Sequence, residues 1–189
     1  MVAKPSSDTP LVTIRMAQTI LEAGFPPGVF NVITGPGGSV GESLVQHPLI
    51  RKVALTGSVE GGRQVMRVAS ESIKRVTLEL GGHCPCIVWN DVDLDKAFEY
   101  ANDTVFGLNA YFFSKNMRRC YLAAQRLEAG SIWINDIHGS FVQAPYGGMK
   151  QSGIRREQGS IAIDEYLEWK TVYQEMSYES RGARICVHH

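Results

Sequence analysis

Apolar residues recur at two spacings along the chain and predict helices that alternate with short strands. The pair Thr9-Pro10 is typical of a helix start, and apolar residues then return every three or four positions as far as Gly24. Further helices are expected near residues 41–46, 58–70, 94–102, 116–127 and 160–166. The expected strands cover residues 29–33, 52–56, 75–79, 85–89, 111–113, 131–135 and 168–178.

The first three expected strands begin at Val29, Lys52 and Arg75, at equal spacing along the chain. Two strand–helix–strand units of equal length favour parallel pairing with right-handed crossovers. The chain therefore belongs to the α/β class, with one parallel sheet in its first half and a smaller α/β lobe after it.

Composition narrows the possible partners. The chain has 189 residues, of which 44% are hydrophobic and 20% charged, as in a globular protein. Because 19 Lys and Arg balance 19 Asp and Glu, a strong attraction to nucleic acid or an anionic membrane is excluded. We find no apolar stretch of membrane-spanning length and no secretory signal. Four irregularly spaced cysteines indicate a reducing environment, so a cytoplasmic protein is expected.

Two glycine-containing turns follow expected strands and open expected helices. They contain Gly37 and Gly57, with Ser58 directly after the second glycine. Helix amino termini present free N–H groups to a pyrophosphate, and glycine lets the ligand approach the backbone closely. The turns are therefore candidates for phosphate binding, although glycines that only make tight turns would give the same pattern.

A second chemistry is suggested by Ser39, which lies in a Gly-x-Ser-x-Gly sequence between an expected strand and an expected helix. This is the context of the nucleophile in many hydrolases, with His138 as a possible base and an aspartate to orient it. An esterase that acts on small esters is thus an alternative function. The simpler alternative is that the same turn only binds phosphate.

Cys84 and Cys86 follow His83 at the start of an expected strand. A neighbouring imidazole could lower the pKa of the Cys84 thiol and make it a nucleophile. No second ligand pair stands at zinc spacing, so no metal site is expected. Since residues two apart on a strand share one face, both thiols could equally be packing residues.

Several segments, in this order, resemble the aldehyde dehydrogenase superfamily. They are Lys4-Pro5-Ser6 with Thr9-Pro10, residues 22–32, Thr56-Gly57-Ser58, Leu78-Glu79-Leu80-Gly81-Gly82, Asn102-Asp103-Thr104 with Gly107-Leu108, residues 130–135, residues 145–153 and Arg156-Glu157. The resemblance covers nearly the whole chain. It implies a Rossmann-like sheet and NAD(P)-dependent oxidation of an aldehyde to an acid.

The resemblance also implies roles for single residues. Lys4 and Ser7 would face the adenosine ribose of NAD or NADP, Ser58 a phosphate oxygen, and Gly81 would belong to the cofactor site. An acidic residue often stands at position 7 in this family, so Ser7 leaves NADP admissible. Glu79 would be the general base that activates water. A solvated glutamate at a strand end is the alternative.

The same resemblance identifies what the chain lacks. The family's nucleophilic cysteine and its Glu-x-Phe-Gly-Pro motif belong to a central segment, which is missing here at a seam near residues 98–101. The family's amino-terminal part is expected to be missing too. Arg155 stands where the family has glycine, which predicts backbone strain. We therefore expect a shortened relative with impaired oxidation. There are two alternatives. One is a hydrolase that uses Ser39 or Cys84, and the other is a non-catalytic module for nucleotide binding or assembly.

The resemblance finally suggests a domain organisation. Residues 1–80 would form a partial dinucleotide-binding lobe, 81–170 a partial catalytic lobe, and 171–189 a C-terminal edge strand and tail. In the family this strand joins the sheet of a partner subunit, and an edge strand offers unpaired backbone groups for such pairing. A homo-oligomer that acts on a small aldehyde or ester is expected.

Overall fold

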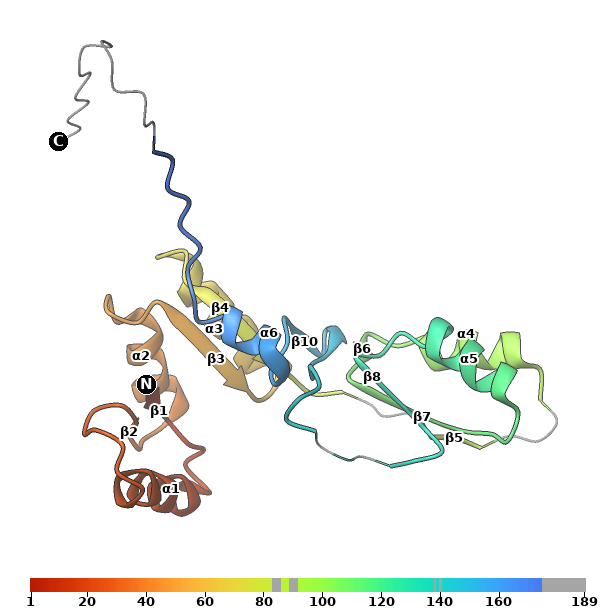
Figure 1. Ribbon diagram of the computed structural model, residues 1–189, viewed down its shortest axis with the longest axis horizontal. Coiled ribbons are helices and arrows are strands. Elements are labelled where there is room, and N and C mark those ends of the chain that lie inside the picture. The colour runs from red at the N-terminus through yellow and green to blue at the C-terminus, as the bar shows by residue number, and fades with distance from the viewer. Residues whose placement is uncertain (83–85, 89–91, 138, 140, 175–189) are drawn as a thin grey trace, which may run out of the picture.

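The computed structural model describes residues 1–82, 86–88, 92–137, 139 and 141–174, with residues 86–88 described as backbone only. Figure 1 shows two sheet-and-helix parts along the long axis of the molecule, with the C-terminal segment leading away from the first part. The helices are α1 (Pro10–Glu22), the π-helical turn η1 (Gly37–Gly41), α2 (Glu42–Gln46), α3 (Val59–Ser70), α4 (Leu94–Asn102), α5 (Met117–Arg126) and α6 (Gly159–Asp164). The strands are β1 (Val2–Ala3), β2 (Asn31–Val32), β3 (Lys52–Thr56), β4 (Arg75–Glu79), β5 (Cys86–Val88), β6 (Phe106–Gly107), β7 (Asn109–Phe113), β8 (Ser131–Ile134), β9 (Met149–Lys150) and β10 (Gly153–Ile154).

The sheet of the first part is built around β4. Strand β3 lies parallel to it, with Lys52 opposite Arg75, which confirms the predicted parallel pairing. On its other side β4 pairs antiparallel with β10, where Gly153 stands opposite Glu79. Strand β2 pairs with β1 in a separate two-stranded sheet, so the predicted pairing of the first strand with the second was wrong. The partner of β2 is instead β1, at the start of the chain.

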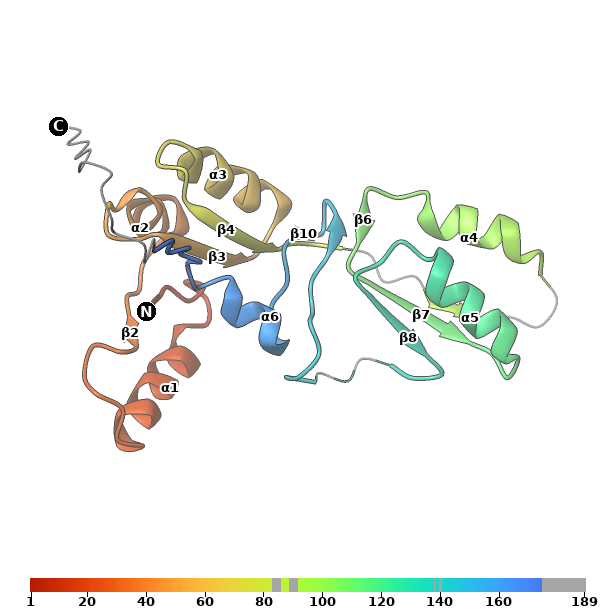
Figure 2. The same cartoon turned by 45° about the horizontal axis from the view of Figure 1, so that its top comes forward.

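The two faces of this sheet have different characters because side chains alternate along each strand. On one face, Val53 and Val76 pack against the core cluster of Val45, Val68 and Ala69 from α2 and α3. Arg75, Thr77 and Glu79 alternate with the apolar residues of β4 and so point to the other face. Figures 1 and 2 place α3 and α6 on opposite sides of β3 and β4. The polar face of β4 is therefore the face that α6 covers.

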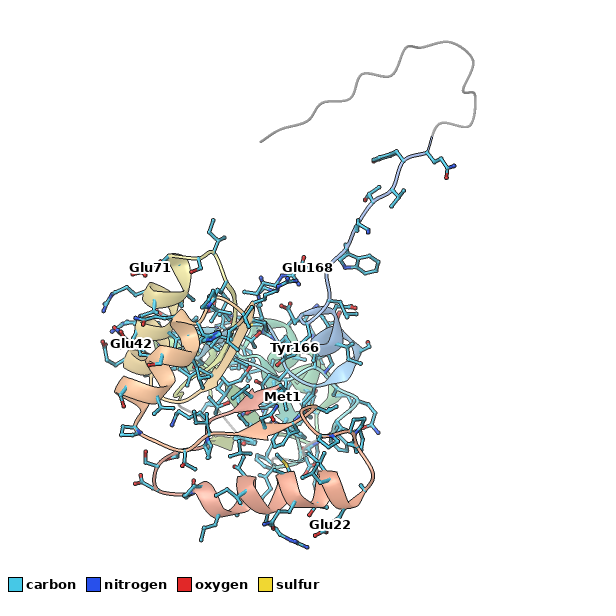
Figure 3. The ribbon with its side chains drawn as sticks, turned by 90° about the vertical axis from the view of Figure 1, so that its left-hand side faces the viewer. Met1, Glu22, Glu42, Glu71, Tyr166 and Glu168 are labelled. Atoms are coloured by element: carbon cyan, nitrogen blue, oxygen red, sulfur yellow. The ribbon has the colours of Figure 1, made fainter. Side chains whose placement is uncertain are left out.

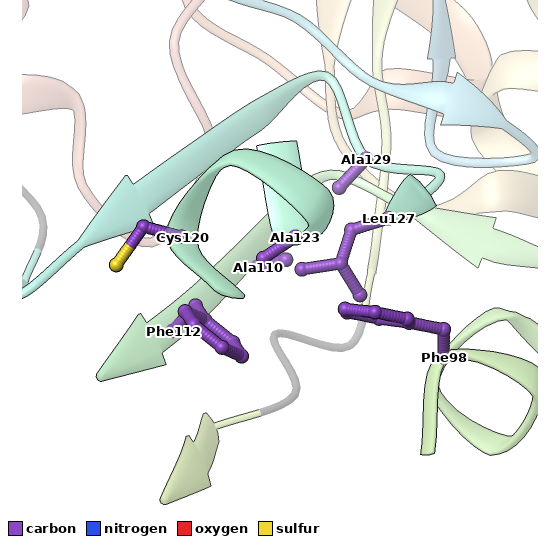
Figure 4. Packing of buried hydrophobic residues seen from close by; sticks show 7 residues of the cluster. All are labelled: Phe98, Ala110, Phe112, Cys120, Ala123, Leu127 and Ala129. Carbon is purple, nitrogen blue, oxygen red and sulfur yellow. The ribbon is translucent and has the colours of Figure 1, made fainter. Parts of the chain in front are cut away.

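The second part holds the larger core. Strands β5, β7 and β8 form a parallel sheet, and α4 and α5 pack on it. The core is a cluster of buried side chains from α4, α5, β7 and the turn that precedes β8, namely Phe98, Ala110, Phe112, Cys120, Ala123, Leu127 and Ala129 (Figure 4). The ring centroids of Phe98 and Phe112 are 6.4 Å apart. Cys120 is thus a packing residue in a helix.

Ser152 joins the two parts and is fully buried. The backbone N–H of Gly107 in β6 donates to its hydroxyl oxygen at 2.9 Å. The N–H of Leu80, directly after β4, donates to its carbonyl oxygen at 2.8 Å. Consequently the loop between β9 and β10 fixes the end of β4 against the second part.

The structure also bears on the predictions made for Arg155, for the C-terminal strand and for membrane-spanning helices. Arg155 has φ +71°, which confirms the predicted strain at the position where the resembled family has glycine. The strand predicted over residues 168–178 was wrong for residues 168–174, which form no strand because no neighbouring strand pairs with them. Residues 175–178 lie outside the described residues. The helices in the described part of the chain are all too short or too polar to span a bilayer.

Candidate functional site

Glu79 is the most unusual side chain on the polar face of β4. It is 6% exposed, and neither carboxylate oxygen accepts a hydrogen bond within the described part of the chain. Its backbone is held firmly, since the carbonyl oxygen of Glu79 accepts from the N–H of Gly57 at 2.9 Å and Gly153 stands opposite it in β10. A buried carboxylate without a hydrogen-bond donor is an exception in folded proteins and points to a functional role.

A glycine-rich loop, which we define as residues 146–157, encloses this carboxylate. A Cβ atom at Gly147 would lie 2.5 Å from Oε1 of Glu79 and 3.0 Å from Cδ of Arg156, so only glycine fits there. Backbone hydrogen bonds of 2.8 and 2.7 Å join Tyr146 to Glu157 and hold the two sides of the loop together. The loop therefore covers Glu79 with backbone on one side and with two charged residues on the other.

This enclosure changes the acidity of Glu79. Burial, followed by the nearby charge of Glu157, raises the pKa of Glu79 to about 7, although the guanidinium of Arg156 opposes the shift. Burial disfavours the charged form of any carboxyl group because the low-dielectric interior solvates the ion poorly. A carboxyl group with a pKa near neutrality exchanges a proton readily at physiological pH, which is the property of a general base.

The residues predicted to face a nucleotide ribose lie together in the first part. Nζ of Lys4 donates to the carbonyl oxygens of Pro5 at 2.7 Å and Gly35 at 3.1 Å. The hydroxyl of Ser7 donates to the same Gly35 oxygen at 3.3 Å. Lys4 and Ser7 thus meet at the turn that leads into η1.

The glycine positions leave room for a ligand. A Cβ atom at Gly37 or Gly81 would meet nothing within 4 Å, so the backbone there is open to an approaching group. Ser58 caps α3, because its hydroxyl oxygen accepts from the N–H of Gly61 at 3.0 Å. The hydroxyl hydrogen of Ser58 stays available to a phosphate oxygen, and Gly57 before it is exposed. Five residues therefore remain candidates for a dinucleotide site, namely Lys4, Ser7, Gly37, Gly57 and Ser58.

Of the predicted hydrolase residues Ser39, Cys84 and His138, the structure describes only Ser39. Ser39 lies in the exposed turn η1, and no hydrogen bond in the described part of the chain joins it to a histidine or a carboxylate. Cys84 and His138 lie outside the described residues. The esterase prediction accordingly gains no support from the structure. Among the described residues, no group of three or more His, Cys, Asp or Glu side chains could hold a metal ion.

The sequence reasoning missed the surroundings of Glu79. Gly147, Arg156 and Glu157 belong to segments that were recognised as motifs, but their proximity to Glu79 was not predicted. The signal that could have identified them is the adjacent pair of opposite charges, Arg156-Glu157, at the end of the glycine-rich loop. A cavity of about 140 Å³ lies next to this loop and is lined in part by Trp133, Phe141 and Tyr146.

Comparison with known proteins places this geometry in a family. The family model described as "Aldehyde dehydrogenase family" matches residues 1–100 and residues 95–172. The two matches meet at the predicted seam. Betaine aldehyde dehydrogenase of Bacillus subtilis is 27% identical over an alignment of 308 residues, which covers 92% of this chain and 63% of that protein. Because the alignment is much longer than the chain, a long stretch of the relative has no counterpart here. This confirms the predicted loss of a central segment.

Solved structures of aldehyde dehydrogenases share the fold of this chain. A crystal structure of an indole-3-acetaldehyde dehydrogenase in its apo form superposes with a TM-score of 0.84 and 34% identity, covering 89% of this chain and 55% of that one. The NAD⁺ complex of an aldehyde dehydrogenase from Bacillus cereus superposes with a TM-score of 0.88 and 26% identity, covering 93% of this chain and 62% of the other. The chain spans about three-fifths of the length of the curated relatives it matches. On this evidence the chain belongs to the aldehyde dehydrogenase family.

Proposed function

We propose that this chain is a shortened aldehyde dehydrogenase that keeps a dinucleotide-binding surface and a general base but is impaired in aldehyde oxidation. The observation that carries the proposal is the buried, unpartnered carboxylate of Glu79, whose pKa of about 7 suits proton transfer at neutral pH. In the family's reaction a glutamate at this position takes a proton from the water that attacks the thioester carbon, and Glu79 would keep this ability. The loop that carries Gly147 keeps bulk solvent away from the carboxylate until substrate and water arrive.

The cofactor would be NAD or NADP, whose nicotinamide ring accepts a hydride when bound. Lys4 and Ser7 would bind the adenosine ribose, because both side chains meet at the Gly35 carbonyl. Ser58 and the backbone at Gly37 and Gly57 would receive the pyrophosphate, where helix amino termini favour negative charge. Since Ser7 carries no charge, a 2′-phosphate is not repelled at this position, and NADP remains a suitable ligand.

The substrate would be a small aldehyde. Tyr146 lines the cavity of about 140 Å³ and directly precedes Gly147, which contacts Glu79. The cavity is a candidate site for the substrate because Tyr146 places it beside the loop that covers the general base. Aromatic walls around a few polar groups are typical of small-molecule sites.

Impaired oxidation follows from the missing central segment. In the family, hydride leaves the substrate only after a cysteine sulfur has attacked the aldehyde carbon, and that cysteine belongs to the segment without a counterpart here. The chain's own cysteines stand in other contexts, and Cys120 is buried in the core of the second part. Glu79 would therefore be a general base without its usual thioester.

We also infer that the chain associates with further copies of itself. Trp169, Val172 and Tyr173 are 88%, 75% and 92% exposed, on the segment that leads away from α6. Apolar side chains on a protruding segment favour association, because burial removes their surface from water.

Cofactor binding can be measured directly by calorimetry. We expect NAD and NADP to bind the full chain and the Lys4→Ala variant to bind roughly tenfold more weakly, since it loses a charge-assisted hydrogen bond. Lys115→Ala removes an exposed lysine of the second part and should change nothing. Ser7→Glu should weaken NADP more than NAD through like-charge repulsion. Absence of heat with both dinucleotides would refute the cofactor surface.

A further inference from the structure

Arg155 has a backbone conformation that a residue with a side chain adopts only under constraint. Its φ of +71° lies in the left-handed region, where a non-glycine residue costs on the order of 1 kcal/mol or more. Some contact of the Arg155 side chain must offset the cost.

That contact is a charged cluster, which we call the clasp and define as Lys52, Arg155 and Glu165. The guanidinium of Arg155 is in direct contact with Oε2 of Glu165, and Nζ of Lys52 lies 3.7 Å from the same oxygen. The side chains of Lys52 and Glu165 are only 10% and 20% exposed. Ion pairs that are this well covered are screened less by solvent than surface pairs.

The charges of the clasp influence one another. Burial opposes ionisation of Glu165, but the hydrogen bond and charge of Arg155, together with the charges of Lys52 and Arg75, outweigh it and lower the pKa of this carboxyl. Burial lowers the pKa of Lys52, and the charge of Arg155 acts in the same direction, while Glu165 opposes both. The single carboxylate of Glu165 therefore holds two cations, and loss of Arg155 would leave it with Lys52 and the more distant Arg75.

The clasp connects distant segments. Lys52 opens β3, Glu165 directly follows α6, and Arg155 follows β10. The ammonium group of Lys52 also lies 5.2 Å from the ring centroid of Tyr166, which Figure 3 shows on the chain just before Glu168. The clasp thereby fixes residue 155 to the polar face of the sheet.

The next two residues of the loop face Glu79. Nη1 of Arg156 donates to the carbonyl oxygens of Gly148 at 3.0 Å and Arg155 at 2.7 Å, and Glu157 pairs with Tyr146 through the backbone. These contacts close the loop over Glu79. Any rotation of the backbone at Arg155 would displace Arg156 and Glu157 together, because a single peptide bond separates Arg155 from Arg156.

We propose that Arg155 is a positioning residue for Glu79. Its ion pair with Glu165, shared with Lys52, holds the loop in the strained conformation that places Arg156 and Glu157 against the buried carboxylate. The catalytic importance of this arrangement rests on the proposed function, whereas the coupling of the clasp to Glu79 does not.

Removal of Arg155 should change the pKa of Glu79 in opposite directions, depending on whether Arg155 positions the loop or acts only through its charge. If Arg155 acted only as a positive charge, its removal would raise the pKa of Glu79 or leave it unchanged. If Arg155 holds the loop closed, its removal admits water to the carboxylate and lowers the pKa. The charged groups that face Glu79 directly are Glu157 and Arg156, and neither is altered by a substitution at position 155.

The test is a carbon-detected NMR titration of the Glu79 carboxyl in the full chain. Arg155→Ala keeps the strained backbone but loses the ion pair, and it should lower the pKa of Glu79 by about one unit, since partial solvation removes part of the burial effect. Arg155→Gly removes the strain together with the ion pair, so it should retain the parent value, and amide shifts of β3 and β4 will verify that the variants fold. Arg155→Lys keeps the charge and should retain the parent value. Arg15→Gln breaks an exposed ion pair with Glu22 on α1 and is the matched control.

An unchanged or raised pKa in folded Arg155→Ala would overturn the proposal, as would a fall of the same size in Arg155→Lys. A parent value close to that of free glutamate would overturn it as well. Failure of the chain to bind NAD or NADP would remove the proposed cofactor role but would leave a measured pKa difference, and therefore the clasp, standing.

Discussion

Replacing Glu79 with glutamine should stabilise the folded chain by about 2–3 kcal/mol at about pH 8 and leave its stability nearly unchanged at about pH 5. The ordinary pKa of a glutamate side chain is 4.5, whereas burial raises that of folded Glu79 to about 7. The native state therefore binds the proton more tightly than the unfolded state does. This contribution to stability is complete below the unfolded pKa and is lost as the pH rises through the folded pKa.

The measurement is urea unfolding of the parent and of Glu79→Gln at several pH values across this window. The parent should lose stability between the two pKa values, and the difference between the two proteins should grow in the same interval. Glu99→Gln on α4 is the matched control, because Glu99 is exposed, and it should show no pH-dependent difference. Equal pH profiles for the parent and Glu79→Gln would show that Glu79 is solvated, as in the alternative interpretation of the sequence.

Replacing Phe112 with alanine should destabilise the second part by about 3–5 kcal/mol, the range found when a fully buried aromatic residue is truncated. Phe112 has no exposed surface and belongs to the core cluster drawn in Figure 4. The loss approaches the entire folding free energy of a marginally stable domain. Phe113→Ala, on the other face of β7 where the side chain is only half-buried, should cost clearly less. Urea unfolding followed by circular dichroism measures both, and equal costs would contradict the assigned core.

The elements that the sequence predicted well are those whose signal is local. Strand β4 and helix α3 were predicted nearly residue by residue, since an alternating or helical apolar pattern fixes the buried side of each. Strands β6, β9 and β10 were missed. Each has two residues and exists only because a distant segment pairs with it. Their pairing is a tertiary effect that no local pattern contains.

The features of the candidate site also fall into those that a local motif predicted and those that depend on tertiary contacts. Glu79 was identified through a motif, and the strain at Arg155 through a glycine position that carries a side chain. The closure of the loop over Glu79 was not predictable, because Gly147 and Arg156 lie far from Glu79 in the sequence and meet it only through the pairing of β10 with β4. The predicted C-terminal strand was wrong over residues 168–174 for the converse reason. Alternation suggested a strand, but no partner strand lies beside it.

The sharpest test of the proposed function is an assay of cofactor reduction. The full chain is mixed with NAD or NADP and a short aldehyde, and the absorbance of the reduced cofactor is followed over time. We predict no reduction above that of Glu79→Gln, because the chain has the general base but not the sulfur that must attack first. Turnover comparable to that of ordinary aldehyde dehydrogenases, lost on Glu79→Gln, would contradict the proposal and would mean that another thiol serves as the nucleophile.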